Sequence, residues 1–185
     1  MTTQESDEVR FGGKRFAITA VDGTGLFDPA AHGLELRAMH TGCWRGHVAR
    51  YVVVDGRLVL RDLHVGAADT PPPLDRVRPR WRAMDHAWHY TKLNLATEFS
   101  GRLLLGHGRF PERPYLNMGF RPAWVFTDVR ELTFRDGTLL AAEDLSSELD
   151  AVRAVAPARP GAGEPADDWI DRTFSLSYAY SWPGH

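Results

Sequence analysis

Alternating hydrophobic and polar positions recur along the chain and predict strands more often than helices. Between residues 48 and 63, two such runs flank Asp55-Gly56. This dipeptide is favoured in a two-residue type I′ turn, because both turn residues need a positive φ angle. A turn of that length pairs Val53 with Leu58 on the core-facing side of the strands. The pattern therefore predicts a β-hairpin over residues 48–63.

The opposite face of this hairpin would place Arg50 across from Arg61. Two facing guanidinium groups repel each other, so the pair needs solvent, an acidic side chain from a neighbouring element or an anionic partner beside it. Surface charges usually contribute little to stability, which favours the first alternative. The other two alternatives stay open on the sequence alone.

A second hairpin is predicted over residues 129–142, where another Asp-Gly dipeptide supplies the turn. In that register Phe134 faces Leu139, and Arg130 can face Glu143 as an attractive cross-strand pair. The turn chemistry shared by the two hairpins is compatible with an internal duplication, and equally with convergence on a common turn.

The rest of the chain adds one helix and one strand to the expected fold. Residues 1–10 are polar and acidic and predict a disordered tail, which leaves residues 11–185 as a single β-rich domain. Apolar residues at helical spacing predict a short helix over 145–156, and the Pro-, Gly- and Ala-rich residues 157–168 predict a linker. From 174 to 182, aromatic residues alternate with small ones, which predicts a final strand. The expected fold class is mostly β, either an antiparallel barrel or a two-sheet sandwich.

Composition restricts the class of partner more than it restricts the fold class. Hydrophobic residues make up 43% and charged residues 25% of the chain, which fits a packed globular core. The formal net charge of -2 argues against nucleic acid as a partner, although the arginine-rich stretch 76–82 would favour it locally. No apolar run is long enough to span a bilayer, and no secretory signal is visible, so we expect a cytoplasmic protein with no membrane partner. Cys43 is the only cysteine, which excludes an intrachain disulfide.

The densest group of reactive side chains lies just before the first hairpin, at residues 39–47. Cys43, Arg45 and His47 share one face if this segment is extended. On that face a nearby positive charge would lower the thiol pKa and make Cys43 a nucleophile, with His40 or His47 as the base. The alternative is a buried, unreactive cysteine with Arg45 in a salt bridge. These four residues form the candidate catalytic group.

Aromatic side chains concentrate in two further stretches, 81–94 and 115–124, and suit contact with a small ligand. The first stretch also contains His86 and His89, but no third ligand follows at a recognisable spacing. We therefore predict no metal site and no cofactor. The candidate ligand-binding residues are Trp44, Trp88, Tyr90, Tyr115, Asn117 and Trp124.

Two short elements carry a resemblance to known sequences. Residues 43–47 read Cys-Trp-Arg-Gly-His, and residues 115–119 read Tyr-Leu-Asn-Met-Gly. The chain resembles a group of uncharacterised bacterial proteins that carry Cys-Trp-Arg-Gly-Tyr and Tyr-x-His-Met-Gly elements, each before a β-hairpin. His47 stands where the group has Tyr, and Asn117 where it has His. The resemblance implies the hairpin architecture and draws attention to Cys43, but it implies no reaction.

The sequence contains none of the common catalytic motifs, such as a phosphate-binding glycine loop or a nucleophile elbow. This favours a small intracellular binding protein, whose partner is either a protein such as a toxin or a small ligand held in the β-domain. The alternative is a cofactor-free enzyme that uses Cys43 as nucleophile and Arg45 to orient a small anionic substrate.

Overall fold

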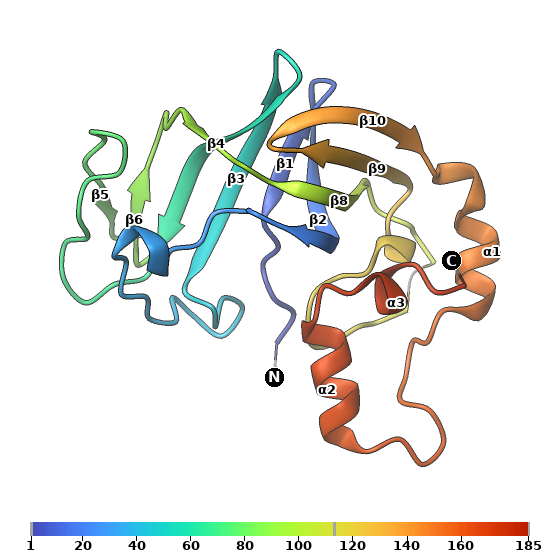
Figure 1. Cartoon of the computed structure of the whole chain (residues 1–185). Coiled ribbons are helices and arrows are strands. Elements are labelled where there is room, and N and C mark those ends of the chain that lie inside the picture. The colour runs from blue at the N-terminus through green and yellow to red at the C-terminus, as the bar shows by residue number, and fades with distance from the viewer. Residues whose placement is uncertain (1, 113, 185) are drawn as a thin grey trace.

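The computed structural model describes residues 2–112 and 114–184, and its strands form one continuous sheet (Figure 1). Buried and partly buried positions alternate along much of β9, as expected for a strand with one face on a core. The strands are β1 (Glu8–Phe11), β2 (Lys14–Thr24), β3 (His47–Val54), β4 (Arg57–Val65), β5 (Arg80–Arg82), β6 (Ala87–Tyr90), β7 (Leu95–Ala96), β8 (Ser100–His107), β9 (Asp128–Arg135) and β10 (Thr138–Asp144).

Seven of these strands close into a barrel in the order β10, β9, β8, β2, β1, β3, β4. Closure joins β4 to β10, where Arg57 pairs with Thr138 and the Leu58 N–H donates to the Gly137 carbonyl at 2.8 Å. The predicted mostly β fold is confirmed, as a barrel and not a two-sheet sandwich. The barrel is mixed and not antiparallel throughout, because β1 and β3 run parallel.

The prediction of a disordered tail over residues 1–10 is wrong for residues 2–10, and residue 1 lies outside the described residues. β1 lies between β2 and β3 and pairs with both, and its Val9 side chain is fully buried. A strand of four residues is too short to show a period in the sequence. It forms because partners distant in the chain supply its hydrogen bonds.

The first predicted hairpin is confirmed as β3 and β4. Asp55 and Gly56 form the turn with φ angles of 49° and 70°, both positive as a type I′ turn requires. Val53 pairs with Leu58, as the turn length predicts.

The second hairpin is also confirmed, as β9 and β10, with Phe134 opposite Leu139. A bulge in β10 then shifts the register by one residue. Arg130 therefore lies opposite Asp144, with its Nη1 atom 2.8 Å from the carboxylate, and not opposite Glu143 as predicted.

The C-terminal segment is helical, so the predicted strand over 174–182 is wrong. α2 (Ala166–Phe174) begins inside the predicted linker, and α3 (Tyr178–Ser181) follows after a short turn. Leu176 in that turn has a φ angle of 50°, which a strand does not accommodate. The predicted helix over 145–156 is confirmed by α1 (Leu149–Val155), which follows a 3₁₀ turn at Ser146–Glu148.

The helices cover one side of the barrel and leave the other side open (Figure 1). A core inside the barrel is separate from a second core on the outer face of β2, β8 and β9. In the second core, Ala20 and Leu104 pack with Trp124, Val152 and Trp182 from the segments that cross this face. Among the residues described, no apolar cluster of this kind lies on the outer face of β1, β3 and β4, where Arg10 and Arg61 are exposed. Over the residues described, no helix has the length and apolar character needed to cross a bilayer.

Candidate functional site

The segment around Cys43 is a turn, so the condition under which Cys43, Arg45 and His47 would share one face of an extended segment is not met. The Cys43 N–H donates to the His40 carbonyl at 2.9 Å, and the thiol donates to the His47 carbonyl at 3.3 Å. Cys43 is only 1% exposed, and burial raises the pKa of its thiol, with a smaller opposing effect from Arg45. This environment favours the thiol form, which is the unreactive form of a cysteine at neutral pH.

Arg45 forms a structural ion pair with Asp7. Its guanidinium donates to both carboxylate oxygens of Asp7, at 2.9 and 2.6 Å. The same carboxylate accepts a hydrogen bond from the Ala49 backbone N–H at 2.6 Å. Asp7 therefore ties the N-terminal segment to the turn and to β3, and the alternative of Arg45 in a salt bridge is what the structure contains.

The two candidate base residues lie in different surroundings. His47 is largely buried, its Nδ1 atom has no hydrogen-bond partner, and burial lowers the pKa of its ring. His40 is half-exposed, with Nε2 3.5 Å from a carboxylate oxygen of Glu5. Among the described residues, neither imidazole ring forms a hydrogen bond with the Cys43 thiol, which donates to the backbone carbonyl of His47.

The candidate ligand-binding aromatics do not come together in one site. Tyr90 and Trp124 are buried in the two separate cores, while Trp44 and Tyr115 are 61% and 91% exposed. Trp88 packs edge-on against the exposed Trp81, with ring centroids 5.4 Å apart.

Asn117 and Tyr115 do border a depression of about 290 Å³ beside Arg109 and Arg121. It is lined by the loop between β8 and β9 together with Thr2 and Thr3, and its lining does not include Trp44, Trp88, Tyr90 or Trp124.

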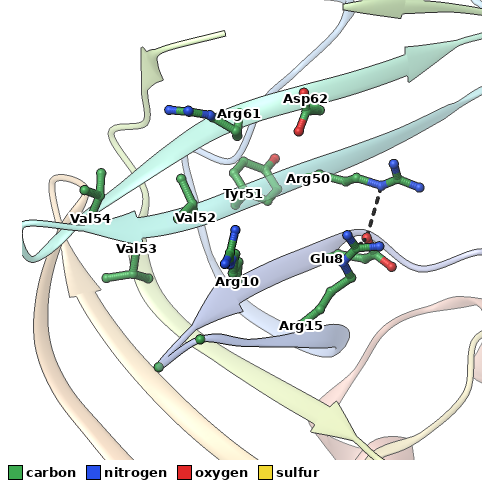
Figure 2. A pocket seen from close by; sticks show the side chains of 12 residues that line it. Glu8, Arg10, Arg15, Arg50, Tyr51, Val52, Val53, Val54, Arg61 and Asp62 are labelled. Carbon is green, nitrogen blue, oxygen red and sulfur yellow. Dashed lines mark ion pairs between the residues drawn. The ribbon is translucent and has the colours of Figure 1, made fainter. Parts of the chain in front are cut away.

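A groove of about 450 Å³ opens on the uncovered face of the barrel. Figure 2 shows four arginine side chains around it, one from each of β1, β2, β3 and β4, together with Glu8 and Asp62. We call it the arginine groove, and its arginines are Arg10, Arg15, Arg50 and Arg61.

Strand pairing explains why these arginines gather. Arg10 and Arg15 are direct cross-strand partners in the hairpin of β1 and β2, so their side chains stand on the same outer face. On its other side Arg10 pairs with Val52 of the parallel strand β3. The glycine turn at residues 12–13, with positive φ at both positions, leaves this end of the groove unobstructed.

A β-bulge brings in the fourth arginine. The register between β3 and β4 shifts between Arg50 and Tyr51, so that Arg50 faces Asp62 and Arg61 becomes the extra residue. The predicted facing of Arg50 and Arg61 is therefore wrong. Bulges re-aim side chains and are frequent beside functional sites. Here the bulge leaves Arg61 lining the groove beside Arg50.

The carboxylates neutralise only part of this positive charge. Glu8 lies 3.0 Å from Nε of Arg50 and 3.7 Å from Nε of Arg15. Within residues 2–112 and 114–184, Arg10 and Arg61 form no ion pair. The acidic side chain that the sequence left open is present as Glu8, yet the groove keeps an excess of guanidinium groups.

A second, larger cavity of about 780 Å³ adjoins the groove, and Arg50 and Asp62 line both. We call it the histidine cleft. The rings of His64 and His89 stack in it, with centroids 3.6 Å apart, and Nη1 of Arg50 lies 3.3 Å from Nε2 of His64.

Both stacked imidazoles are held in the neutral form. Burial, and next the charge of Arg50, lower the pKa of His64 to about 4. Burial also lowers the pKa of His89, although Asp85 opposes the effect from 3.0 Å. These rings therefore act as hydrogen-bonding groups at neutral pH and add no positive charge to the cleft.

The part of the chain that the structure describes contains no group of three or more His, Cys, Asp or Glu side chains arranged to hold a metal ion. His86 and His89 belong to the hairpin of β5 and β6 and not to a helix. Within this hairpin, Nε2 of His89 lies 3.0 Å from a carboxylate oxygen of Asp85.

Sequence reasoning missed most of the arginine groove. The repulsion expected between Arg50 and Arg61 was the one signal, since it raised the alternative of an anionic partner. Arg10 lay in the segment predicted as a tail, and nothing in the sequence pairs it with Arg15 or places β1 beside β3. Comparisons with known protein families, with curated proteins and with solved structures find no match for this chain.

Proposed function

We propose that this protein binds a small organic anion in the arginine groove. The observation that carries the proposal is the convergence of four arginines on one open groove that holds only two carboxylates. Bringing like charges together on adjacent strands costs stability, and a bound anion would offset that cost. Guanidinium groups also match the geometry of carboxylates and phosphates, to which they donate paired hydrogen bonds.

The groove has the size and lining of a site for a small molecule. Its volume of about 450 Å³ falls within the range of ligand pockets in proteins. Val52 and the 43% exposed Val54 add apolar surface next to the arginines. We therefore propose a ligand that joins a carboxylate or phosphate group to a short apolar body.

Isothermal titration calorimetry with octanoate and with octyl phosphate tests the proposal. We expect both anions to bind, with an affinity that falls as the salt concentration rises, because the contacts are partly exposed ion pairs. The double variant Arg10→Ala/Arg61→Ala should weaken binding about tenfold or more, equivalent to roughly 1.4 kcal/mol.

Arg135→Ala is the matched control, because Arg135 is an exposed arginine of β9 that does not line the groove. It should leave the affinity unchanged. A melting temperature of the double variant equal to or above that of the unchanged protein would show that the groove variant is folded, as expected when the repulsion between neighbouring arginines is relieved.

The proposal is overturned if neither anion binds, or if the groove variant and the control bind equally well. Native mass spectrometry of protein purified gently from its own host adds an independent test. A retained small anion supports the proposal, whereas a co-purifying protein with no anion binding would favour a protein partner instead.

A further inference from the structure

The arginine groove and the histidine cleft form one continuous track on the outer face of the barrel. They share a wall made of Arg50 and Asp62, which are cross-strand partners in β3 and β4. The groove lies toward the hairpin tip of these strands, and the cleft begins at His64, farther along β4. A ligand longer than the groove would therefore extend across this wall into the cleft.

The two ends of the track differ in charge. Apart from the shared wall, the groove end carries three positive charges and one negative charge. The positive charges belong to Arg10, Arg15 and Arg61, and the negative charge belongs to Glu8. The cleft end carries Arg82 against two carboxylates, Glu5 and Asp85. The track is thus positive at one end and negative at the other, which complements a ligand of the opposite polarity.

Among the described residues, one buried polar atom in the cleft has no hydrogen-bond partner. The His89 side chain is only 9% exposed, and its Nε2 atom is buried without a hydrogen bond. Oδ2 of Asp85 lies 3.0 Å from Nε2, but the two atoms lack the alignment of a hydrogen bond. In the ring tautomer that carries its proton on Nδ1, both atoms are acceptors. An ammonium group has three N–H donors and can serve both of them.

We propose that the ligand is a zwitterion, whose anionic group binds in the arginine groove and whose ammonium group binds in the histidine cleft at Asp85 and His89. This inference rests on the proposed function and adds the chemistry of the second end. Asp85 is half-exposed, so its carboxylate is open to a ligand entering from solvent.

The strand geometry sets the length of such a ligand. From Arg61 to His64 the chain of β4 advances three residues, one of which is the extra residue of the bulge, so the advance is at most about 10 Å at the usual rise per strand residue. A straight chain of eight carbons with a terminal carboxylate and a terminal amine has a comparable span. 8-Aminooctanoate is therefore a suitable probe, with octanoate as the anion without the amine and octylamine as the amine without the anion.

Calorimetric titration of the full chain with these three compounds tests the inference. We expect 8-aminooctanoate to bind about tenfold more tightly than octanoate, and octylamine to bind more weakly than either. Asp85→Asn should remove the advantage of 8-aminooctanoate and leave octanoate binding unchanged. Asp69→Asn, at an exposed position outside both cavities, is the matched control and should leave both affinities as they are.

The failure of this inference is distinguishable from the failure of the proposed function. If octanoate binds as tightly as 8-aminooctanoate, or if Asp85→Asn weakens both equally, the zwitterion is ruled out while anion binding in the groove stands. If no anion binds at all, the proposed function is lost and the inference with it.

Discussion

At the scale of single residues, the side chains that look most reactive in the sequence have structural roles. The Cys43 thiol donates a hydrogen bond to a backbone carbonyl, and Arg45 forms an ion pair with Asp7. The arginines that line the groove, by contrast, lie on exposed strand positions that look ordinary in the sequence. A reactive residue type is therefore a weaker guide to function here than the residues that remain without partners.

Cys43 should react slowly with alkylating reagents. Its thiol is buried, and burial raises its pKa, so little thiolate is present at neutral pH. We expect iodoacetamide at neutral pH to label the folded protein far more slowly than the same protein unfolded in urea, as followed by mass spectrometry. Equally fast labelling in both states would restore Cys43 as a candidate nucleophile.

Asp7→Asn should destabilise the protein strongly. The carboxylate accepts from Arg45 and from the Ala49 N–H at a site that is 8% exposed, and its neutralisation leaves the Arg45 charge poorly compensated. Breaking such a pair costs about 3 kcal/mol or more. Asp22→Asn is the control, because its partner Arg102 lies in an exposed pair worth less than about 1 kcal/mol. Urea unfolding measures both, and equal losses would contradict the structural role of Asp7.

At the scale of elements, the strand that completes the barrel is β1, which the sequence pattern did not predict. β1 joins β2 to β3, and without it the two halves of the sheet would lose their connection on this side. The same strand carries Arg10 and Glu8 into the groove. Barrel closure and the proposed ligand site thus depend on one short segment.

Val9→Ala tests the position of β1. Val9 is fully buried in the barrel core, so removing two methyl groups should lower the free energy of unfolding by about 2 kcal/mol. Val54→Ala makes the same chemical change at a side chain that is 43% exposed, and it should cost less than about 1 kcal/mol. Urea denaturation measures both variants. A disordered tail would instead predict no effect of Val9→Ala.

At the scale of the whole molecule, one side of the barrel is closed by helices and the other side is left for ligands. The second core buries the outer face of β2, β8 and β9 beneath the C-terminal half of the chain. The exposed face of β1, β3 and β4 then carries both cavities. This asymmetry gives the protein one open face, on which the arginine groove and the histidine cleft lie side by side.

Neutral buried histidines should make the folded state sensitive to acid. The pKa of His64 is about 4 in the folded protein, below the ordinary histidine value of 6.5. Between these two pH values the unfolded chain binds a proton that the folded chain does not, so stability falls as pH falls through this window. Burial lowers the pKa values of His47 and His89 as well, which adds to the slope in the same direction.

His64→Gln should therefore reduce the pH dependence of stability. Urea unfolding of the variant and the unchanged protein between pH 6.5 and pH 4 would measure the two slopes. We expect the variant to lose less stability over this window, because glutamine takes up no proton in either state. Parallel slopes would show that His64 titrates alike in the folded and unfolded chains.

The sequence determined those parts of the structure that depend on neighbours along the chain. The two Asp-Gly turns set the conformation of their hairpins and the pairing next to the turn, because a type I′ turn needs only two residues that accept positive φ. The helix over 145–156 follows from local apolar spacing in the same way. The mostly β class was therefore readable without tertiary contacts.

Only the tertiary structure decided the pairing of β1, the bulge at Arg61, the barrel closure and the helical C-terminal segment. Each depends on groups far apart in the sequence, and alternation alone cannot separate a strand from aromatic residues that pack from short helices. The arginine groove belongs to this second group, because its four side chains come from four strands. Its charge exists only once strand pairing brings Arg10, Arg15, Arg50 and Arg61 to one face.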